Sequence, residues 1–170
     1  RRFTPLSPLT TWTPIGPAPI PNGQTVSPTN PVSGRVTAIV VHPTDPNVVF
    51  AGTSDGVYRS TDRGKTFRRA NFPDKTQIWS FLVDAGNPKL IFAGASPIAI
   101  YRSEDCGETW RKMPDPGMPD RAVMPFACRV MRMAQHPKQP GTIFAALEVN
   151  GVMRTTDGGE SWTDVSKDLI

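Results

Sequence analysis

The chain has 170 residues, of which 38% are hydrophobic and 20% charged, with 19 prolines, 14 glycines and a formal net charge of +4. The hydrophobic share is too high for a disordered chain, and so much proline and glycine favours short strands joined by turns over long helices. No apolar run reaches the roughly 18 residues of a membrane span, and the basic residues are too scattered for a nucleic-acid-binding stripe. We therefore expect neither a membrane span nor a nucleic-acid partner.

Residues 1–34 are rich in proline, and we expect them to run over the surface as an extended arm. Within this arm, residues 10–16 (TTWTPIG) are similar to residues 160–166 (ESWTDVS), which end a later repeat. The similarity predicts an outer strand near residues 10–16 that has no inner strands of its own.

Residues 35–170 repeat one pattern three times, in segments of about 35–72, 76–114 and 128–166. Each segment reads as a strand, a proline-containing turn, a second strand, a short loop, a third strand, a tight connection and a short fourth strand. Four short strands in about 40–50 residues are typical of a β-propeller blade. The sequence therefore predicts an all-β fold, a β-propeller of four-stranded antiparallel blades with three blades in this chain.

Three blades are fewer than the roughly four to eight that close a propeller ring. A single blade cannot bury both of its faces, so blades have to stack around an axis. We therefore expect a larger ring, completed by further blades, by other copies of the chain or by a protein partner.

The tight connection before each fourth strand carries the motif Ser/Thr-x-Asp-x-Gly-x-Thr/Ser-aromatic. The aspartate is expected to accept hydrogen bonds from its own turn, the glycine to adopt a positive φ, the hydroxyls to bridge the two strands and the aromatic ring to pack between neighbouring blades. The motif residues are Ser60, Asp62, Gly64, Thr66 and Phe67; Ser103, Asp105, Gly107, Thr109 and Trp110; and Thr155, Asp157, Gly159, Ser161 and Trp162.

The three aspartates are most simply structural residues. One motif lies on the rim of each blade, so their carboxylates are too far apart for the paired acids of glycoside hydrolysis. Calcium ligation and acid–base catalysis are the less favoured alternatives.

These motifs resemble the Asp-box, or bacterial neuraminidase repeat, of sialidases, xyloglucanase-type glycosidases and sortilin ectodomains. The resemblance covers residues 33–167 and implies the β-propeller fold. It also implies an extracellular or periplasmic location. Because enzymes and non-enzymes share the repeat, it does not decide the function.

The specific marks of the enzyme families are missing from this sequence. Sialidases share an aromatic-Arg-Ile-Pro tetrapeptide that does not occur here, and Tyr58 and Tyr101 lie in strands where blade packing is the simpler role. Xyloglucanase-type enzymes resemble the stretch HPTDPNVVFAGTSDGVYRS, but Gly52, Thr53 and Ser54 stand where an acid is expected, with Asp55 displaced by one residue. We therefore assign no catalytic residue and no cofactor.

Arg35, Gln77 and Arg129 begin the first strands of the three repeats. If those strands line the propeller axis, the three side chains ring one mouth of the channel, where two guanidinium groups and an amide would bind a carboxylate or phosphate. Solvated polar strand starts are the favoured alternative. Arg132 aligns with Ala38 and Ser80 and would face the channel or a partner.

His42, Asp84 and His136 occupy one repeat position, and two histidines with an aspartate are a possible zinc set. Each begins a proline-containing turn, so capping of that turn is favoured and we predict no metal site. Cys106 and Cys128 lie at opposite ends of their blades and are expected to be free thiols.

Two functions from different classes remain. The first is a non-catalytic interaction or scaffold module that binds a protein partner, supported by an adaptable loop containing Met113, Met118 and Met124. The alternative is a glycan-processing or glycan-binding domain whose active residues lie in other blades. Within this chain, Asp115 and Asp120 are the only acids that we would offer for that role.

Overall fold

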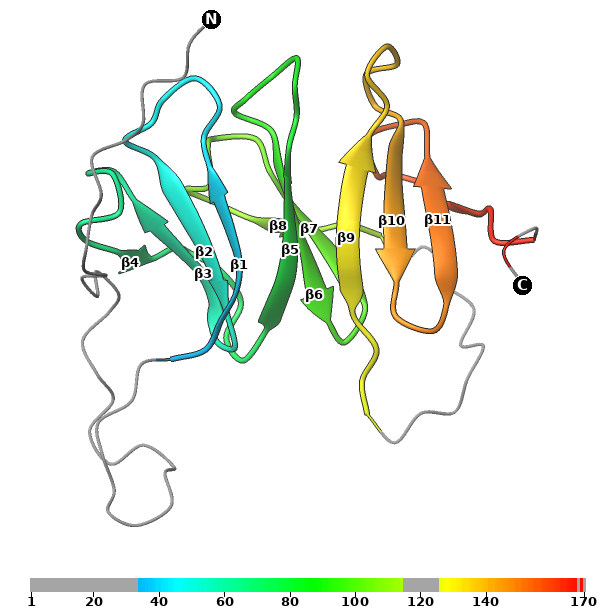
Figure 1. Cartoon of the computed structure of the whole chain (residues 1–170), viewed down its shortest axis with the longest axis horizontal. Helices are drawn as coiled ribbons and strands as arrows, with labels where there is room; N and C mark the ends of the chain where they lie inside the picture. Colours follow the sequence, from blue (N-terminus) through cyan, green and yellow to red (C-terminus); the bar gives the residue numbers. More distant parts are fainter. Residues whose placement is uncertain (1–33, 115–125, 168, 170) are drawn as a thin grey trace, which may run out of the picture.

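The computed structural model describes residues 34–114, 126–167 and 169. The described residues form twelve strands, without a helix, in three four-stranded sheets that stand side by side (Figure 1). All strand pairs within the sheets are antiparallel, so the prediction of three propeller blades is confirmed. The predicted arm and its outer strand near residues 10–16 lie outside the described residues. No described segment is a helix suited to crossing a membrane.

Each sheet keeps the chain order of its strands. The first blade contains β1 (Val36–Val41), β2 (Val49–Thr53), β3 (Gly56–Ser60) and β4 (Arg68–Arg69). The second blade contains β5 (Gln77–Val83), β6 (Ile91–Ser96), β7 (Ala99–Ser103) and β8 (Arg111–Lys112). The third blade contains β9 (Val130–Gln135), β10 (Ile143–Leu147), β11 (Gly151–Thr155) and β12 (Thr163–Asp164).

The first strands of the three blades lie along a common side of the molecule. Strand β1 contacts β5, and β5 contacts β9, which is the arrangement of blades around an axis (Figure 1). Each of these strands loses register with its neighbour at the same repeat position, at Thr37, Trp79 and Met131. A bulge of this kind re-aims the side chain that it leaves unpaired.

Two hydrophobic clusters hold neighbouring blades together. In the first, Phe50 and Phe72 from the first blade pack with Ile78 and Tyr101 from the second. In the second, Phe92 from the second blade packs against residues of the third, including Val130, Ile143 and Met153. Strand β6, in the middle blade, is buried along its whole length because a sheet covers each of its faces. Burial between blades is therefore what joins the three sheets.

Glycine in the second strand allows the inner strand of the next blade to approach closely. A Cβ atom on Gly52 would lie 2.6 Å from Ile78 Cγ2, and one on Gly94 would lie 2.7 Å from Val130 Cβ. Real Cβ atoms do not tolerate such distances, so both junctions depend on these glycines. The third blade has Ala146 at the equivalent position, opposite Arg132 of β9.

The role expected for Met113 is wrong. Its side chain is only 3% exposed and packs in the second interblade cluster, because its backbone N–H bonds to Ile100 O and continues the pairing of the fourth strand. Met113 is therefore a core residue and not part of an adaptable loop. Met118 and Met124 lie outside the described residues.

Candidate functional site

The three Asp-box hairpins share one hydrogen-bond network. In the first, the Ser60 hydroxyl donates to Asp62 Oδ1 at 2.8 Å, and the Gly64 N–H donates to Ser60 Oγ at 2.9 Å. Thr66 donates to the same carboxylate through its N–H at 2.9 Å and its hydroxyl at 2.6 Å. The second and third boxes repeat these bonds with Asp105 and Asp157. The two hydroxyls thus bridge the strands through the carboxylate.

This network changes the acidity of the box carboxylates. The hydroxyl and N–H of Thr66, followed by the Ser60 hydroxyl, lower the pKa of Asp62 to about 2. Hydrogen bonds from Ser161 and then Thr155 lower the pKa of Asp157 in the same way. Burial alone raises the pKa of Asp105, but its hydrogen bonds outweigh burial and the net pKa is lowered. The carboxylates are therefore committed acceptors, which suits a structural role better than proton transfer.

The glycine and the aromatic residue of each box have roles in backbone geometry and in packing. Gly64, Gly107 and Gly159 all have positive φ, at 78°, 81° and 95°. The indole N–H groups of Trp110 and Trp162 donate to the carbonyl oxygens of Gly107 and Gly159, both at 3.1 Å. Both indoles also pack against the interblade clusters, as the sequence predicted.

Arginine–glutamate pairs join the second and third boxes to the blade before each of them. Arg59 Nη1 of β3 lies 2.9 Å from Glu108 Oε1, in the second box. Arg102 and Arg111 of the second blade lie 3.2 and 2.7 Å from Glu160 Oε1, in the third box. The hydrogen bond from Arg111 lowers the pKa of Glu160. Sequence reasoning missed these pairs, although arginine recurs before every box and glutamate at the sixth position of two boxes.

The predicted mouth residues lie together in the structure, around a residue that the sequence did not single out. Arg35 Nη2 donates to Gln77 Oε1 at 3.4 Å. The guanidinium carbons of Arg35 and Arg129 lie 5.3 and 4.0 Å from the centre of the Trp79 ring. Trp79 is the bulged residue of the middle inner strand, and its repeat equivalents are threonine and methionine. The repeat pattern of the sequence therefore gave no indication that Trp79 lies at the mouth.

The two arginines of the mouth differ in charge balance. Arg129 Nε donates to Glu148 Oε2 at 2.6 Å, which neutralises its charge, whereas Arg35 has only the neutral amide of Gln77 as its described hydrogen-bond partner. Trp79 Nε1 is buried and has no hydrogen-bond partner among the described residues. Anion binding at the mouth stays a prediction. The groups available for it are the guanidinium of Arg35 and the N–H of Trp79, neither of which has a carboxylate partner among the described residues.

The inner strands also line a small hollow along the common side. Its volume is about 220 Å³, and it is lined by Ala38, Ser80 and Arg132 together with the bulged residues Thr37, Trp79 and Met131. Arg132, Ala38 and Ser80, which align in the sequence, thus lie close together in the structure. The exposed Arg132 places a further positive charge beside the mouth.

His42, Asp84 and His136 each cap a turn. His42 Nδ1 accepts from Asp45 N at 3.1 Å, and His136 Nδ1 accepts from Lys138 N at 3.2 Å. Asp84 Oδ1 accepts from the N–H groups of Gly86 and Asn87, both at 2.8 Å. Within the part of the chain that the structure describes, no group of three or more such side chains is placed to hold a metal ion. Cys106 and Cys128 are both free thiols.

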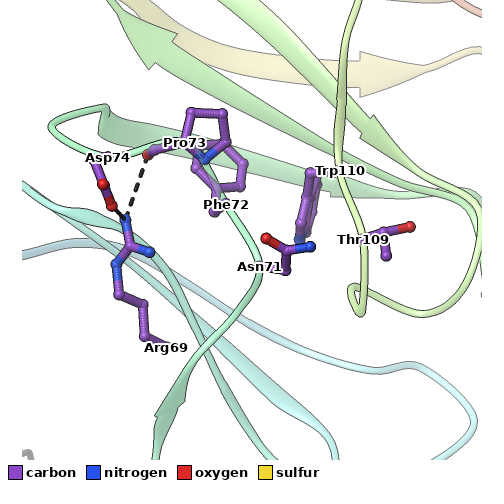
Figure 2. A pocket seen from close by; sticks show the side chains of 7 residues that line it. All are labelled: Arg69, Asn71, Phe72, Pro73, Asp74, Thr109 and Trp110. Carbon is purple, nitrogen blue, oxygen red and sulfur yellow. Dashed lines mark hydrogen bonds and ion pairs between the residues drawn. The ribbon is translucent and has the colours of Figure 1, made fainter.

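A hollow of about 410 Å³ lies on the rim between the first blade and the second box (Figure 2). Figure 2 shows Asn71 beside Trp110, with Arg69 turned toward Asp74 on the other side. Arg69 Nη2 lies 2.8 Å from Asp74 Oδ1. The Phe72 ring packs at a tilt against Tyr101 and edge-to-face against Trp110, with ring centroids 4.6 and 5.5 Å apart, so packing between blades already occupies these rings. The hollow offers a sugar little free aromatic surface.

The acids considered for glycoside hydrolysis stay without support. The carboxylate of Asp55 lies 3.5 Å from Arg69 Nε, an ion pair on the rim of the first blade. Asp115 and Asp120 lie outside the described residues. No catalytic residue is assigned.

Among known proteins, the chain is similar in sequence to xyloglucanases. No family model matches the chain. A xyloglucanase of Paenibacillus sp is 28% identical over 165 residues, which cover 76% of this chain and 16% of that protein. Xyloglucanase Xgh74A of Acetivibrio thermocellus is 27% identical over 164 residues, which cover 76% and 20%. The chain thus spans a fifth or less of the curated relatives that it matches.

Solved structures resemble the fold over the same region. A GH74 xyloglucanase from Xanthomonas campestris has a TM-score of 0.63 at 21% identity, covering 78% of this chain and 24% of that one. The structure described as YCF48 bound to D1 peptide has a TM-score of 0.59 at 15% identity, covering 76% and 40%. This chain is a partial β-propeller. The fold of this chain is thus similar to part of a xyloglucanase and to part of a protein solved with a bound peptide.

Proposed function

We propose that the chain is a non-catalytic interaction segment of an Asp-box propeller, which binds a protein partner at the mouth formed by Arg35, Gln77, Trp79 and Arg129. The observation that carries this proposal is the convergence of these side chains from two neighbouring blades and the strand start of the third. The partner chemistry that fits is an extended peptide segment bearing a carboxylate.

Three features support this choice. Among the described residues no carboxylate pairs with the guanidinium of Arg35, which attracts an anion, and none supplies the acceptor that a peptide carbonyl would give the buried Trp79 Nε1. The box aspartates are occupied by their own turns and offer no catalytic pair. YCF48, whose fold is similar, has been solved with a bound peptide.

The test is fluorescence anisotropy of a labelled polyglutamate peptide titrated with the full chain, with a polylysine peptide as the counter-probe. Arg35→Gln is expected to weaken polyglutamate binding by about three- to tenfold, the size of one charge-assisted hydrogen bond. Trp79→Phe keeps an aromatic ring at this position but removes the unpaired N–H, and it should also weaken binding. Arg68→Gln, an exposed arginine on the rim, is the matched control and should not. Equal effects of Arg35→Gln and Arg68→Gln would contradict binding at the mouth.

The second candidate is a glycan-processing or glycan-binding role, and the two xyloglucanase relatives are the observation that favours it. It predicts retardation of the chain in gels containing xyloglucan, or release of reducing sugar from that polymer. We expect neither from this chain, because the aromatic faces of the rim hollow are used in packing. Retardation that Trp110→Ala abolishes would favour the glycan role over the protein partner.

We also propose an extracellular or periplasmic location. The support is the resemblance to Asp-box proteins and to the xyloglucanases above. Fractionation of the source cells, with detection of the chain by antibody, tests this location directly.

A further inference from the structure

The two junctions between blades follow one rule. Phe50 and Arg59 are cross-strand partners in the first blade, and Phe92 and Arg102 are the equivalent partners in the second. In both, the phenylalanine is fully buried toward the next blade and the arginine pairs with a glutamate at the sixth box position of that blade. Phe144 and Arg154 are the equivalent partners in the third blade.

The outer face of the third blade has this pattern without the neighbour. Arg154 is exposed, and among residues 34–114 and 126–167 no carboxylate pairs with it. Phe144 is only partly buried, although its equivalents Phe50 and Phe92 are 0% exposed. An arginine beside an incompletely buried ring is what each internal junction would present if its next blade were removed. The third blade therefore presents, on this face, the same pattern as the two internal junctions.

The opposite face, on the first blade, is also uncovered. Val36, Ile39 and Val41 of β1 are 49%, 68% and 53% exposed. The equivalents of Val36 in the second and third blades, Ile78 and Val130, are both 0% exposed because a preceding blade covers them. This face has Lys65, not glutamate, at the sixth box position.

A second copy of this chain does not fit the third blade in the manner of the internal junctions. Head-to-tail docking would bring Lys65 of the copy against Arg154, so that two cations face each other. It would also bring Val36 of the copy against Ala146, where the internal junctions need Gly52 and Gly94 to admit Ile78 and Val130. Charge and shape therefore both oppose it.

We infer that the face formed by Phe144, Ala146 and Arg154 docks an Asp-box blade of different sequence, which has a carboxylate at the sixth box position and a residue smaller than valine at the position of Ile78. The inference goes beyond the proposed function, which concerns the mouth, and names the chemistry of the neighbouring blade. The carboxylate completes the ion pair of Arg154, and the small residue makes room for the Ala146 methyl group.

The experiment converts a second copy into such a neighbour. The triple variant Val36→Ala/Lys65→Glu/Arg154→Glu presents a small residue and a carboxylate on its first blade, while Glu at position 154 opposes self-association. All three positions are exposed in the structure, so the substitutions leave the interblade clusters intact. The variant is mixed with the unaltered chain, and complex formation is followed by sedimentation velocity over a range of concentrations.

We expect the mixture to form a one-to-one complex at least about tenfold tighter than either protein forms with itself, as one repaired ion pair and one relieved clash predict. The control variant Val36→Ala/Lys65→Gln/Arg154→Glu lacks a carboxylate at position 65 and should bind the unaltered chain more weakly than the triple variant does. The receptor variant Arg154→Gln should bind the triple variant more weakly than the unaltered chain does. Self-association of the unaltered chain as tight as the mixture would overturn the inference, as would equal binding of the control. This readout is independent of the mouth, so loss of peptide binding at Arg35 would contradict the proposed partner without touching this result.

Discussion

The ring of Phe50, in the first blade, lies against the backbone of Gly107, in the second Asp-box, and fills the space that a Cβ atom on Gly107 would need. Gly107 also has φ 81°, a conformation that side chains other than glycine rarely adopt. The box glycine therefore serves two purposes, since it turns the hairpin and seats the ring of the preceding blade.

Gly107→Ala should lower the free energy of unfolding by about 2–5 kcal/mol, because backbone strain and overpacking act together. Urea denaturation followed by tryptophan fluorescence measures this change. Gly158→Ala is the control: Gly158 has φ 72°, but the nearest atom to its Cβ position is 3.8 Å away, so strain alone should cost about 1 kcal/mol. Equal losses for the two variants would show that the ring of Phe50 moves aside.

The box carboxylates should make stability depend on acidic pH. The pKa of Asp62 in the folded chain is about 2, below the unfolded value of about 3.9, and those of Asp105 and Asp157 are lowered too. Their stabilisation is complete above the unfolded pKa and is lost as pH falls through the folded pKa. Tm should therefore fall between about pH 4 and pH 2. Asp105→Asn should melt lower than the unaltered chain at neutral pH and show a shallower fall, whereas parallel profiles would remove Asp105 from this effect.

Phe72 should contribute strongly to stability because it joins two blades. It is 4% exposed, and its ring packs at a tilt against Tyr101 and edge-to-face against Trp110 of the second blade. Phe72→Ala is expected to cost about 3–5 kcal/mol in chemical denaturation, the usual range for a buried phenylalanine. Phe126, 44% exposed, is the matched ring, and Phe126→Ala should change stability by less than about 0.5 kcal/mol. A small effect at Phe72 would mean that the blades are held by other contacts.

The glycines of the second strands give a further test of the junctions. Gly94→Ala should destabilise the chain by about 1–3 kcal/mol, since its Cβ would overlap Val130. The reciprocal change on the uncovered third blade, Ala146→Gly, should cost only about 0.5–1 kcal/mol of backbone entropy. Thermal denaturation of both variants compares them. A tolerated Gly94→Ala would argue against close approach of β6 and β9.

Repetition explains which parts of this structure could be predicted. The boxes recur with invariant chemistry, so their hairpins, the four-stranded blades and the placement of Trp110 and Trp162 between blades followed from alignment alone. Arg35, Gln77 and Arg129 could be gathered at one mouth for the same reason. Trp79 could not, because a bulge selects its position and its equivalents are chemically different. Met113 was misplaced because it follows a fourth strand of only two residues, after which the pattern gives no register.

The junctions themselves were missed for another physical reason. Gly52, Gly94 and Ala146 occupy one repeat position in the sequence, yet the role of that position depends on the residue that the neighbouring blade places against it. Gly94 is explained by Val130, which is 36 positions away in sequence. Side chains that contact each other between sheets have no fixed spacing in the sequence, so these contacts could be identified only in the three-dimensional structure.

The middle blade is clamped on both faces, whereas each outer blade has one described neighbour. In a stacked array, local opening begins where fewest neighbours restrain a unit. Amide hydrogens of β6 should therefore exchange with deuterium last, and those of β1 and β11 earlier. Trp79 belongs to this middle blade, so we expect it to stay in place at the mouth while the outer sheets open locally.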